Sequence, residues 1–380
     1  MGNDREKNAI IDREQFPKLF EVLRTQGYQI VGPAVREGVI LYDDINGVED
    51  LPKGKTDEQS PGSYRLKKRG DNALFGFTVG PQSPKKFLLP MRLKLFDAHK
   101  EGRGFRVSSG LNSNSDKLPR LAFIGIKPCE VSAIAIQDKI FLEGMYADPV
   151  YRSLSEHSMI IDVNCTSPGN LCFCASMKTG PKTSKGFDLA LTEIINADEH
   201  YFIVDVGSEK GSALLQSVPN RPVESSQEKM AQQVFDQAVH TMGKTIDMTD
   251  VRTLLFENLE HPEWDAVAAR CLTCANCTLV CPTCFCTTVE DTTDLSGERT
   301  ERWRRLNSCF TLDFTKVAGG NFRTSAKSRY RQWLTHKLAG WYDQFGSSGC
   351  VGCGRCITWC PVGIDIVAEV DAIRGDGISR

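Results

Sequence analysis

The sequence predicts an α/β domain over residues 1–217, followed by a mainly α-helical domain over residues 218–380. Three observations lead to this division. In the first half, short apolar segments alternate with helix-prone ones, which favours strands and helices packed in layers. After a proline-containing, linker-like stretch at residues 219–222 the chain becomes polar and helix-prone. Two regularly spaced cysteine runs then occupy residues 271–281 and 350–360, and the segment between them includes a helical pattern.

The first helix is predicted from four apolar residues at helical spacing, Phe16, Leu19, Phe20 and Leu23, and Gly27 marks its end. Further helices are expected at residues 131–141, after a turn at 127–130, and from 211 to 215. Strands are expected at residues 28–35, 38–42, 121–126, 159–163 and 201–206.

Two other features of the first half shape this prediction. Gly32-Pro33 is expected to break the chain between extended pieces, and no hairpin is predicted there. Residues 43–70 are polar and are expected to form loop or edge structure. Neither a G-x-G-x-x-G motif nor a P-loop follows any predicted strand, so a dinucleotide or nucleotide site is not indicated.

The second half is expected to be helical around the cysteine runs. Helices are predicted at residues 226–242, 249–259, 264–270 and 327–341. The long segment between the runs is expected to be a helical insert.

Both cysteine runs read C-x2-C-x2-C-x3-C-P, the spacing of bacterial ferredoxins that bind 4Fe-4S clusters. Three closely spaced thiolates hold one cluster, and the fourth cysteine, before proline, binds the other cluster in two-cluster proteins. Each predicted cluster therefore takes three ligands from one run and its fourth ligand from the other run. The expected ligands are Cys271, Cys274, Cys277 and Cys360 for cluster 1, and Cys350, Cys353, Cys356 and Cys281 for cluster 2.

Other readings of these cysteines remain open at this point. Zinc also takes four thiolates, although usually as two separated C-x2-C pairs. Disulfides need an oxidising compartment, which nothing in the sequence suggests. Structural clusters without a redox role are a further alternative, but two adjacent clusters more often form an electron path.

Composition excludes several classes of protein. The 380 residues carry 46 basic and 48 acidic side chains, a formal net charge of −2, so a strongly basic nucleic-acid binder is not expected. No apolar stretch is long enough to span a bilayer. The charged N-terminus, residues 1–7, leads into no signal-peptide core, and Glu6 argues against myristoylation. A soluble, cytoplasmic protein is expected.

Seven of the fifteen cysteines lie outside the runs. Cys165, Cys172 and Cys174 are close in sequence, with Cys129 after a strand as a possible fourth partner, and a third metal site is one of two open readings. Buried free thiols that only pack are the alternative. Cys284, Cys286 and Cys309 have two readings, weak S–H donors to cluster sulfurs or simple packing.

Several motifs resemble the iron-sulfur β subunit of cytosolic NAD(P)-linked NiFe hydrogenases, the sulfhydrogenases, whose family includes the A subunit of anaerobic sulfite reductase. The matching pieces are spread from the middle of the chain to its end. They are residues 125–130 (Gly-Ile-Lys-Pro-Cys-Glu), 164–165, 172–174, 281–286 (Cys-Pro-Thr-Cys-Phe-Cys), 307–309 and 350–365. The helical insert resembles an α-helical ferredoxin.

The resemblance implies an electron-transfer subunit with two 4Fe-4S clusters and no catalytic residues of its own. Its expected partners are a flavin-containing NAD(P)H-oxidoreductase subunit and a catalytic metal subunit, a NiFe hydrogenase. The alternatives are the same relay role in an anaerobic sulfite reductase or a heterodisulfide-reductase-type complex. A stand-alone redox enzyme with a pocket in the N-terminal domain, or a redox sensor, is also open.

Overall fold

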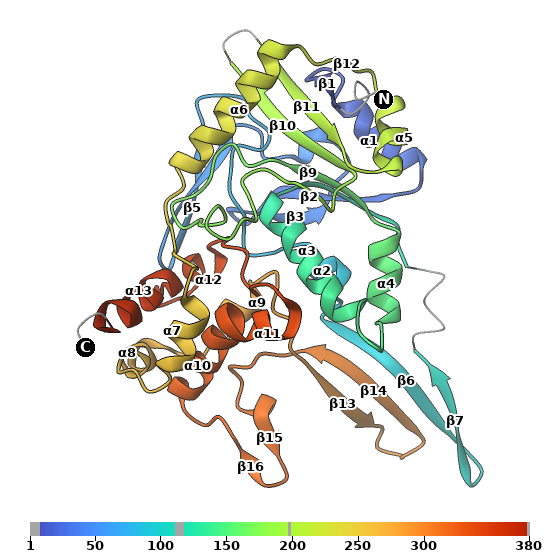
Figure 1. Cartoon of the computed structure of the whole chain (residues 1–380). Helices are drawn as coiled ribbons and strands as arrows, with labels where there is room; N and C mark the ends of the chain where they lie inside the picture. The colour runs from blue at the N-terminus through green and yellow to red at the C-terminus, as the bar shows by residue number, and fades with distance from the viewer. Residues whose placement is uncertain (1–7, 111–117, 197–198, 378–380) are drawn as a thin grey trace.

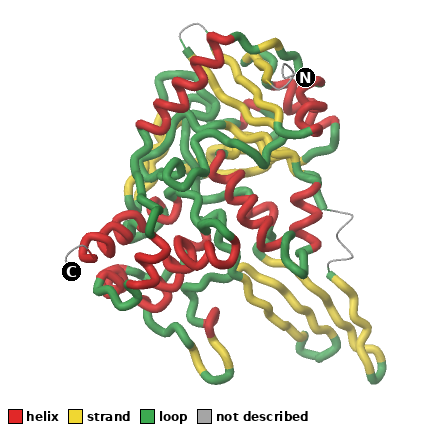
Figure 2. Tube along the Cα trace, viewed as in Figure 1, coloured by secondary structure: helices red, strands yellow, loops and turns green. Residues whose placement is uncertain are grey.

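The computed structural model describes residues 8–110, 118–196 and 199–377 (Figure 1). The charged segment 1–7, for which no targeting role was expected, lies outside the described residues. A large sheet flanked by helices forms one end of the molecule, and a group of helices and a smaller sheet form the other (Figures 1 and 2).

The large sheet has eight strands in the order β12-β1-β11-β10-β9-β8-β2-β3. Its centre, from β10 to β2, is parallel, and both edges are antiparallel. The parallel strands are covered on both faces, which explains why β8 is apolar and buried throughout. In sheet order the strands are β12 (Arg221–Pro222), β1 (Asn8–Asp12), β11 (His200–Val206), β10 (Leu189–Ile195), β9 (Met159–Val163), β8 (Leu121–Ile126), β2 (Gln29–Arg36) and β3 (Val39–Asp44).

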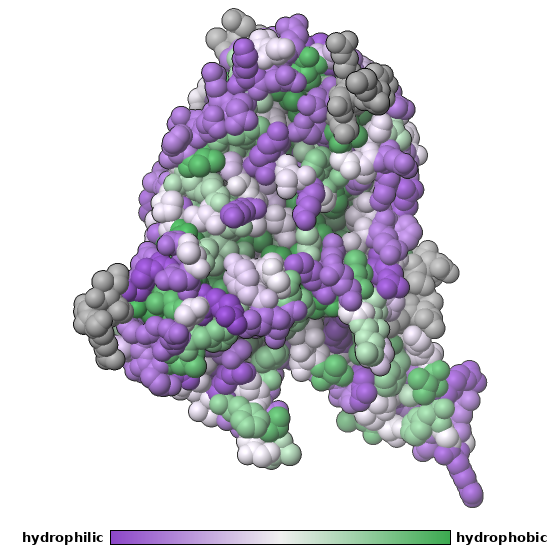
Figure 3. All heavy atoms as spheres, in the orientation of Figure 1, coloured by the Kyte–Doolittle hydropathy of each residue, from purple (hydrophilic) through white to green (hydrophobic). Residues whose placement is uncertain are grey.

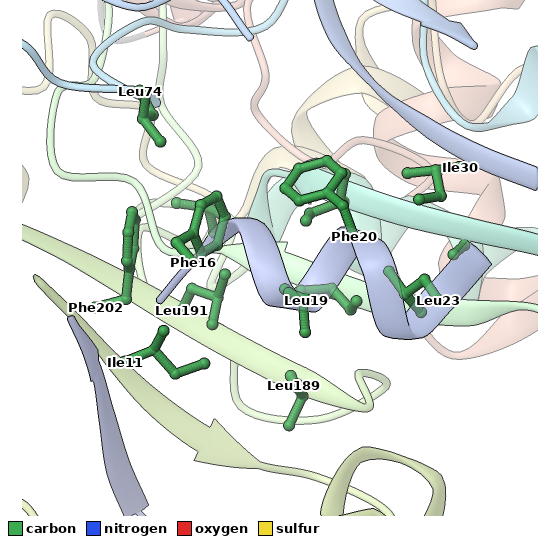
Figure 4. Close-up of a cluster of buried hydrophobic side chains, with 14 of the residues drawn as sticks. Ile11, Phe16, Leu19, Phe20, Leu23, Ile30, Leu74, Leu189, Leu191 and Phe202 are labelled. Atoms are coloured by element: carbon green, nitrogen blue, oxygen red, sulfur yellow. The ribbon is translucent and has the colours of Figure 1, made fainter. Parts of the chain in front are cut away.

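Helices α1 (Pro17–Thr25) and α5 (Glu209–Gln216) pack on one face of this sheet. Figure 4 shows the predicted apolar stripe of α1 against strand side chains, with the rings of Phe16 and Phe202 stacked 4.3 Å apart. The other face is covered by α2 (Lys85–Leu88), α3 (Pro128–Phe141), α4 (Pro149–Glu156) and α6 (Ser225–His240). The predicted α/β character of the N-terminal region is thus confirmed.

Two local predictions are wrong in instructive ways. Gly32-Pro33 lies inside β2 and does not break it, and β2 and β3 form a hairpin that turns at Glu37-Gly38. Both turn residues have positive φ, which suits the twist of a tight hairpin. The expected turn at residues 127–130 is the first turn of α3, where Pro128 occupies an N-terminal position and the Glu130 carboxylate accepts the backbone N–H of Lys127 at 2.9 Å.

A second, antiparallel sheet joins strands from both halves of the chain. Its order is β13-β14-β6-β7, with β13 (Thr287–Thr293), β14 (Arg299–Leu306), β6 (Arg92–Glu101) and β7 (Gly104–Ser109). The segment between the cysteine runs, expected to be helical, is therefore β in its first half. Strand β13 (Thr-Thr-Val-Glu-Asp-Thr-Thr) is rich in β-branched residues, which favour strands, and ion pairs join Arg302 to Asp291 and Arg305 to Glu290 across the hairpin.

The remaining C-terminal elements are helices around a core that includes Trp264, Tyr330 and Trp333. They are α7 (Val251–Glu257), α8 (Glu263–Arg270), α9 (Asn276–Leu279), α10 (Ala326–Thr335), a π-helical turn (His336–Gly340), α11 (Trp341–Phe345), α12 (Arg355–Thr358) and α13 (Ile366–Gly377). Two small hairpins complete the fold, β4 (Lys55–Ser60) with β5 (Ser63–Lys68), and β15 (Lys316–Val317) with β16 (Gly320–Asn321).

The β6–β7 and β15–β16 hairpins project at the bottom of the view, and apolar side chains are exposed on both (Figure 3). Phe105 and Val107 on β7 are exposed, as are Val317 on β15 and the nearby Phe322. Within the described residues, no helix is long and apolar enough to cross a membrane.

Candidate functional site

The two cysteine runs adopt matching backbone conformations. Each run has positive φ at the residue before its second cysteine and again at the residue after it. These residues are Thr273 and Ala275 in the first run and Gly352 and Gly354 in the second. In both runs the residue before the second cysteine donates its backbone N–H to the first cysteine Sγ, at 3.4 Å. The short helices α9 and α12 then carry the third cysteines and pack against each other.

The first cavity draws its cysteines from both runs. Cys271, Cys274 and Cys277 line it together with Cys360 of the second run, and the space between its lining atoms is about 420 Å³. Its other walls are largely apolar and include Phe310, Tyr330 and Trp333, with Cys356 on one side. Cys274 is exposed and its neighbour Leu272 is 61% exposed, so this cavity lies near the surface.

The second cavity holds the complementary set. Cys350, Cys353 and Cys356 line it together with Cys281 of the first run, and the space between its lining atoms is about 290 Å³. Cys356 lines both cavities, so the two are immediate neighbours. Each cavity thus includes the four cysteines that the spacing predicts for one cluster, and the first cavity has Cys356 in addition. The ligand sets stay a prediction.

Positive charge surrounds the second cavity. Lys337, from the π-helical turn, is buried and donates hydrogen bonds to Cys281 Sγ (3.2 Å), Thr283 Oγ1 (3.0 Å) and the Gly349 carbonyl (3.0 Å). Buried Lys85 donates to the carbonyl oxygens of Cys281 (2.6 Å) and Cys284 (3.0 Å). Lys337 thus contacts the side chain of Cys281, and Lys85 contacts its backbone carbonyl.

These contacts change the acidity of Cys281. A hydrogen bond with the Cys284 thiol is the largest cause that holds the pKa of Cys281 well below its ordinary value, and Lys337 and Lys85 add to it against the effect of burial. Burial alone would lower the pKa of Lys337, but the facing cysteines raise it overall. The site therefore favours a thiolate at Cys281 beside a charged lysine.

A buried ion pair fastens the second run to the α/β region. The guanidinium of Arg355 donates to the carboxylate of Glu130 at the start of α3, and both side chains are fully buried. Arg355 also donates to the Gly80 (2.7 Å) and Gln82 (2.9 Å) carbonyls, and the Tyr42 hydroxyl donates to Glu130. Arg355 is also one of the residues that line the second cavity.

The donor chemistry of both cavities suits iron-sulfur clusters. Each offers at least four sulfur ligands, and all fifteen cysteines carry free thiols. In the part of the chain that the structure describes, no three His, Cys, Asp or Glu side chains are grouped closely enough to hold a single metal ion.

The seven spare cysteines fall into two groups. Cys129, Cys165, Cys172 and Cys174 line a third cavity. Cys284 interacts with Cys281, and Cys286 interacts with Cys309. Cys284, Cys286 and Cys309 are not among the residues that line the two run cavities.

Sequence reasoning did not identify Lys85, Lys337 or Arg355 as parts of the site. Lysine and arginine are usually exposed, and nothing in their sequence spacing marks these three as buried. Lys85 comes to the site from the first half of the chain, and Lys337 from the unusual π-helical turn.

Comparisons with known proteins agree with this geometry. Residues 270–364 match the family model described as a 4Fe-4S dicluster domain. The chain is also 28% identical over 372 residues to sulfhydrogenase 2 subunit beta of Pyrococcus furiosus, a match that covers 95% of this chain and 96% of that protein. No solved structure matches the chain. The resemblance to sulfhydrogenase β subunits that the sequence motifs indicate is confirmed, and it extends over nearly the whole chain.

Proposed function

We propose that this chain is an electron-transfer subunit of a multisubunit hydrogenase and holds two 4Fe-4S clusters. Cys271, Cys274, Cys277 and Cys360 would hold one cluster, and Cys350, Cys353, Cys356 and Cys281 the other. When bound, such clusters supply one-electron exchange at potentials set by charge, hydrogen bonds to sulfur and burial. The chain itself supplies the eight thiolates, the charge of Lys337 and the burial.

The observation that carries the proposal is the contact between the two cavities. They share Cys356, and the first lies near the surface. A purely structural metal site would not need a second one beside it, whereas a relay needs adjacent centres and one close to a partner. The β-subunit relative supports the hydrogenase assignment.

The finer parts of the proposal concern architecture and partners. We keep the division into an α/β domain at 1–217 and an α-helical ferredoxin-type domain at 218–380 as a proposal, in which β12 and α6 of the second part pack with the large sheet of the first and the β13–β14 hairpin is inserted. The partners would be a flavin-containing NAD(P)H-oxidoreductase subunit and a catalytic NiFe subunit. Fifteen free thiols fit a reducing compartment, so we place the complex in the cytoplasm.

A second candidate, a stand-alone redox enzyme, is favoured by one observation. An open cleft between α3 and the loops after β9 is lined by Lys139, Lys178, Lys182 and Lys185, and Cys350 forms part of its wall. An anionic flavin or substrate bound there would lie beside the second cysteine run. Flavin content of the purified chain separates the candidates, because a relay subunit carries none.

The test of the main proposal is a paired assay. The isolated chain should accept electrons from dithionite but neither oxidise NAD(P)H nor turn over hydrogen. Once a flavin subunit and a catalytic subunit are added, Cys274→Ala and Cys353→Ala should each interrupt flow from NAD(P)H to the terminal acceptor. The flavin subunit should still reduce an artificial dye, which bypasses the relay.

The matched control is Cys286→Ser, which removes a cysteine that lies outside both cavities and should keep the end-to-end rate. If Cys274→Ala and Cys353→Ala also kept it, the clusters would not be the electron path and a structural role would replace the proposal. The subunits that co-purify distinguish a hydrogenase from a sulfite reductase or a heterodisulfide-reductase-type complex.

A further inference from the structure

Four cysteines outside the runs meet at a third cavity. Cys129 is the second residue of α3, directly after β8, and Cys165, Cys172 and Cys174 lie in the long loop after β9. Strands β8 and β9 are parallel neighbours, so Cys129 and Cys165 both follow carboxyl ends at the same edge of the sheet. Ligands of open α/β sheets bind outside this edge.

The third cavity resembles the two run cavities in size and in its ligand type. The space between its lining atoms, open solvent included, is about 340 Å³, which lies between the corresponding 290 Å³ and 420 Å³ of the run cavities. Cys129, Cys172 and Cys174 are buried, and Cys165 is partly so. The four cysteines line one space, as the cysteines of the two runs line theirs.

The cavity wall also carries positive charge. Lys127, which is 2% exposed, lies in the wall, and its ammonium group donates to the Phe75 carbonyl at 2.9 Å. A cluster held by four thiolates is anionic, and a buried cation beside it compensates that charge. The second cavity has the same arrangement, with Lys337 in its wall.

The second cysteine run is built directly against the third site. The Phe173 N–H donates to the Gly352 carbonyl at 2.8 Å, and Thr179 Oγ1 donates to the Val351 carbonyl at 2.6 Å. A Cβ on Gly352 would lie 2.7 Å from the backbone of Phe173, so only glycine permits this approach. Phe173 packs into the core of the cysteine runs, whereas Cys174 packs with Cys129 and Cys353.

We propose that Cys129, Cys165, Cys172 and Cys174 hold a third 4Fe-4S cluster beside the second cavity. Cys353 lines both of these cavities, as Cys356 lines the first and the second. The three sites therefore form a row that runs from the exposed Cys274 through the second run to the edge of the large sheet. This rests on the proposed relay and extends it toward the α/β region.

The test is a metal count on the full chain purified without oxygen. We expect about twelve irons and a similar amount of acid-labile sulfide per chain, because each of three clusters contributes four. Cys165→Ser/Cys172→Ser should lower the count to about eight while the electron paramagnetic resonance signals of the two run clusters persist. Cys286→Ser/Cys309→Ser, which removes two cysteines outside all three cavities, should keep about twelve.

Two results would overturn the inference. One is a wild-type count of about eight irons, which needs no variant and so does not depend on how a variant folds. The other is about one zinc per chain that disappears with Cys165→Ser/Cys172→Ser, which would make the site a zinc site. Either result leaves the two-cluster relay standing, so the two proposals fail separately.

Discussion

Lys337 points its ammonium group at the sulfur of Cys281, with Nζ and Sγ 3.2 Å apart, inside the wall of the second cavity. In the second run, the sulfur of the corresponding fourth cysteine, Cys360, instead accepts a hydrogen bond from the backbone N–H of Ile364, at 3.3 Å. The two runs have matching backbone conformations, but the donor at this sulfur is a charged lysine in the first run and a neutral backbone N–H in the second. The clusters they would hold should therefore have different reduction potentials.

Lys337→Gln should make the reduction potential of the cluster at the second cavity more negative. Removing a positive charge disfavours the added electron, and a charge-assisted hydrogen bond contributes about 1.5–3 kcal/mol. Since about 59 mV corresponds to a tenfold change for one electron, a shift of roughly 60 mV or more is expected. A redox titration followed by electron paramagnetic resonance measures it. Lys244→Gln, which removes a lysine paired with Asp365, is the control. An unchanged potential in Lys337→Gln would show that this contact does not tune the cluster.

The fourth ligands should be exchanged between the runs. Cys360→Ser should damage the cluster held by Cys271, Cys274 and Cys277, since Cys360 lines that cavity. Cys281→Ser should damage the cluster of the second run. Electron paramagnetic resonance of the reduced variants distinguishes the two signals. If each substitution perturbed only the cluster of its own run, the crossed assignment would be wrong.

The pair Cys286 and Cys309 gives a pH prediction. A hydrogen bond with Cys309 lowers the pKa of Cys286 to about 7. Because the pKa lies below that of an ordinary thiol, the reactive thiolate forms at lower pH. Alkylation of Cys286 by iodoacetamide should accelerate between pH 6 and 8 and then level off. In Cys309→Ala the rise should move to higher pH, and mass spectrometry of the labelled peptide locates the site. An identical pH profile in both proteins would show that Cys309 does not lower the pKa of Cys286.

Local patterns in the sequence were sufficient where one element carries its own signal. The stripe of Phe16, Leu19, Phe20 and Leu23 predicts α1 because helical periodicity and burial coincide. The cysteine spacing likewise predicts two groups of four, and those groups line separate cavities. The ligand sets themselves stay a prediction, as does the domain boundary at 217/218.

Local sequence patterns do not predict contacts between segments that are distant in the chain. The arginine-rich strand β14 pairs with β6, about two hundred residues earlier in the chain, and nothing in its own sequence shows that partner. Lys85 and Glu130 reach the cysteine runs only because the two halves pack together. Cys129, a possible partner of Cys165 from sequence alone, is brought beside it because β8 and β9 are neighbours in the sheet.

The matching positions Ala275 and Gly354 allow a paired test of how the runs are built. Both have positive φ, 69° and 75°, but a Cβ on Gly354 would lie 2.6 Å from the Leu171 carbonyl oxygen. Gly354→Ala adds that clash to the roughly 1–2 kcal/mol cost of a left-handed non-glycine residue. We expect it to destabilise the protein by more than about 2 kcal/mol and to weaken the cluster signal of the second run.

Ala275→Gly makes the reverse change in the first run. It relieves backbone strain, but it loses a buried methyl group, worth about 0.8 kcal/mol, and adds flexibility to the unfolded chain. These effects oppose one another, so the melting temperature should change little and the first cluster should be retained. Thermal melts and cluster spectra of the two variants, measured side by side, decide the matter. Equal tolerance of both substitutions would mean that the close approach of Gly354 to Leu171 does not constrain the second run.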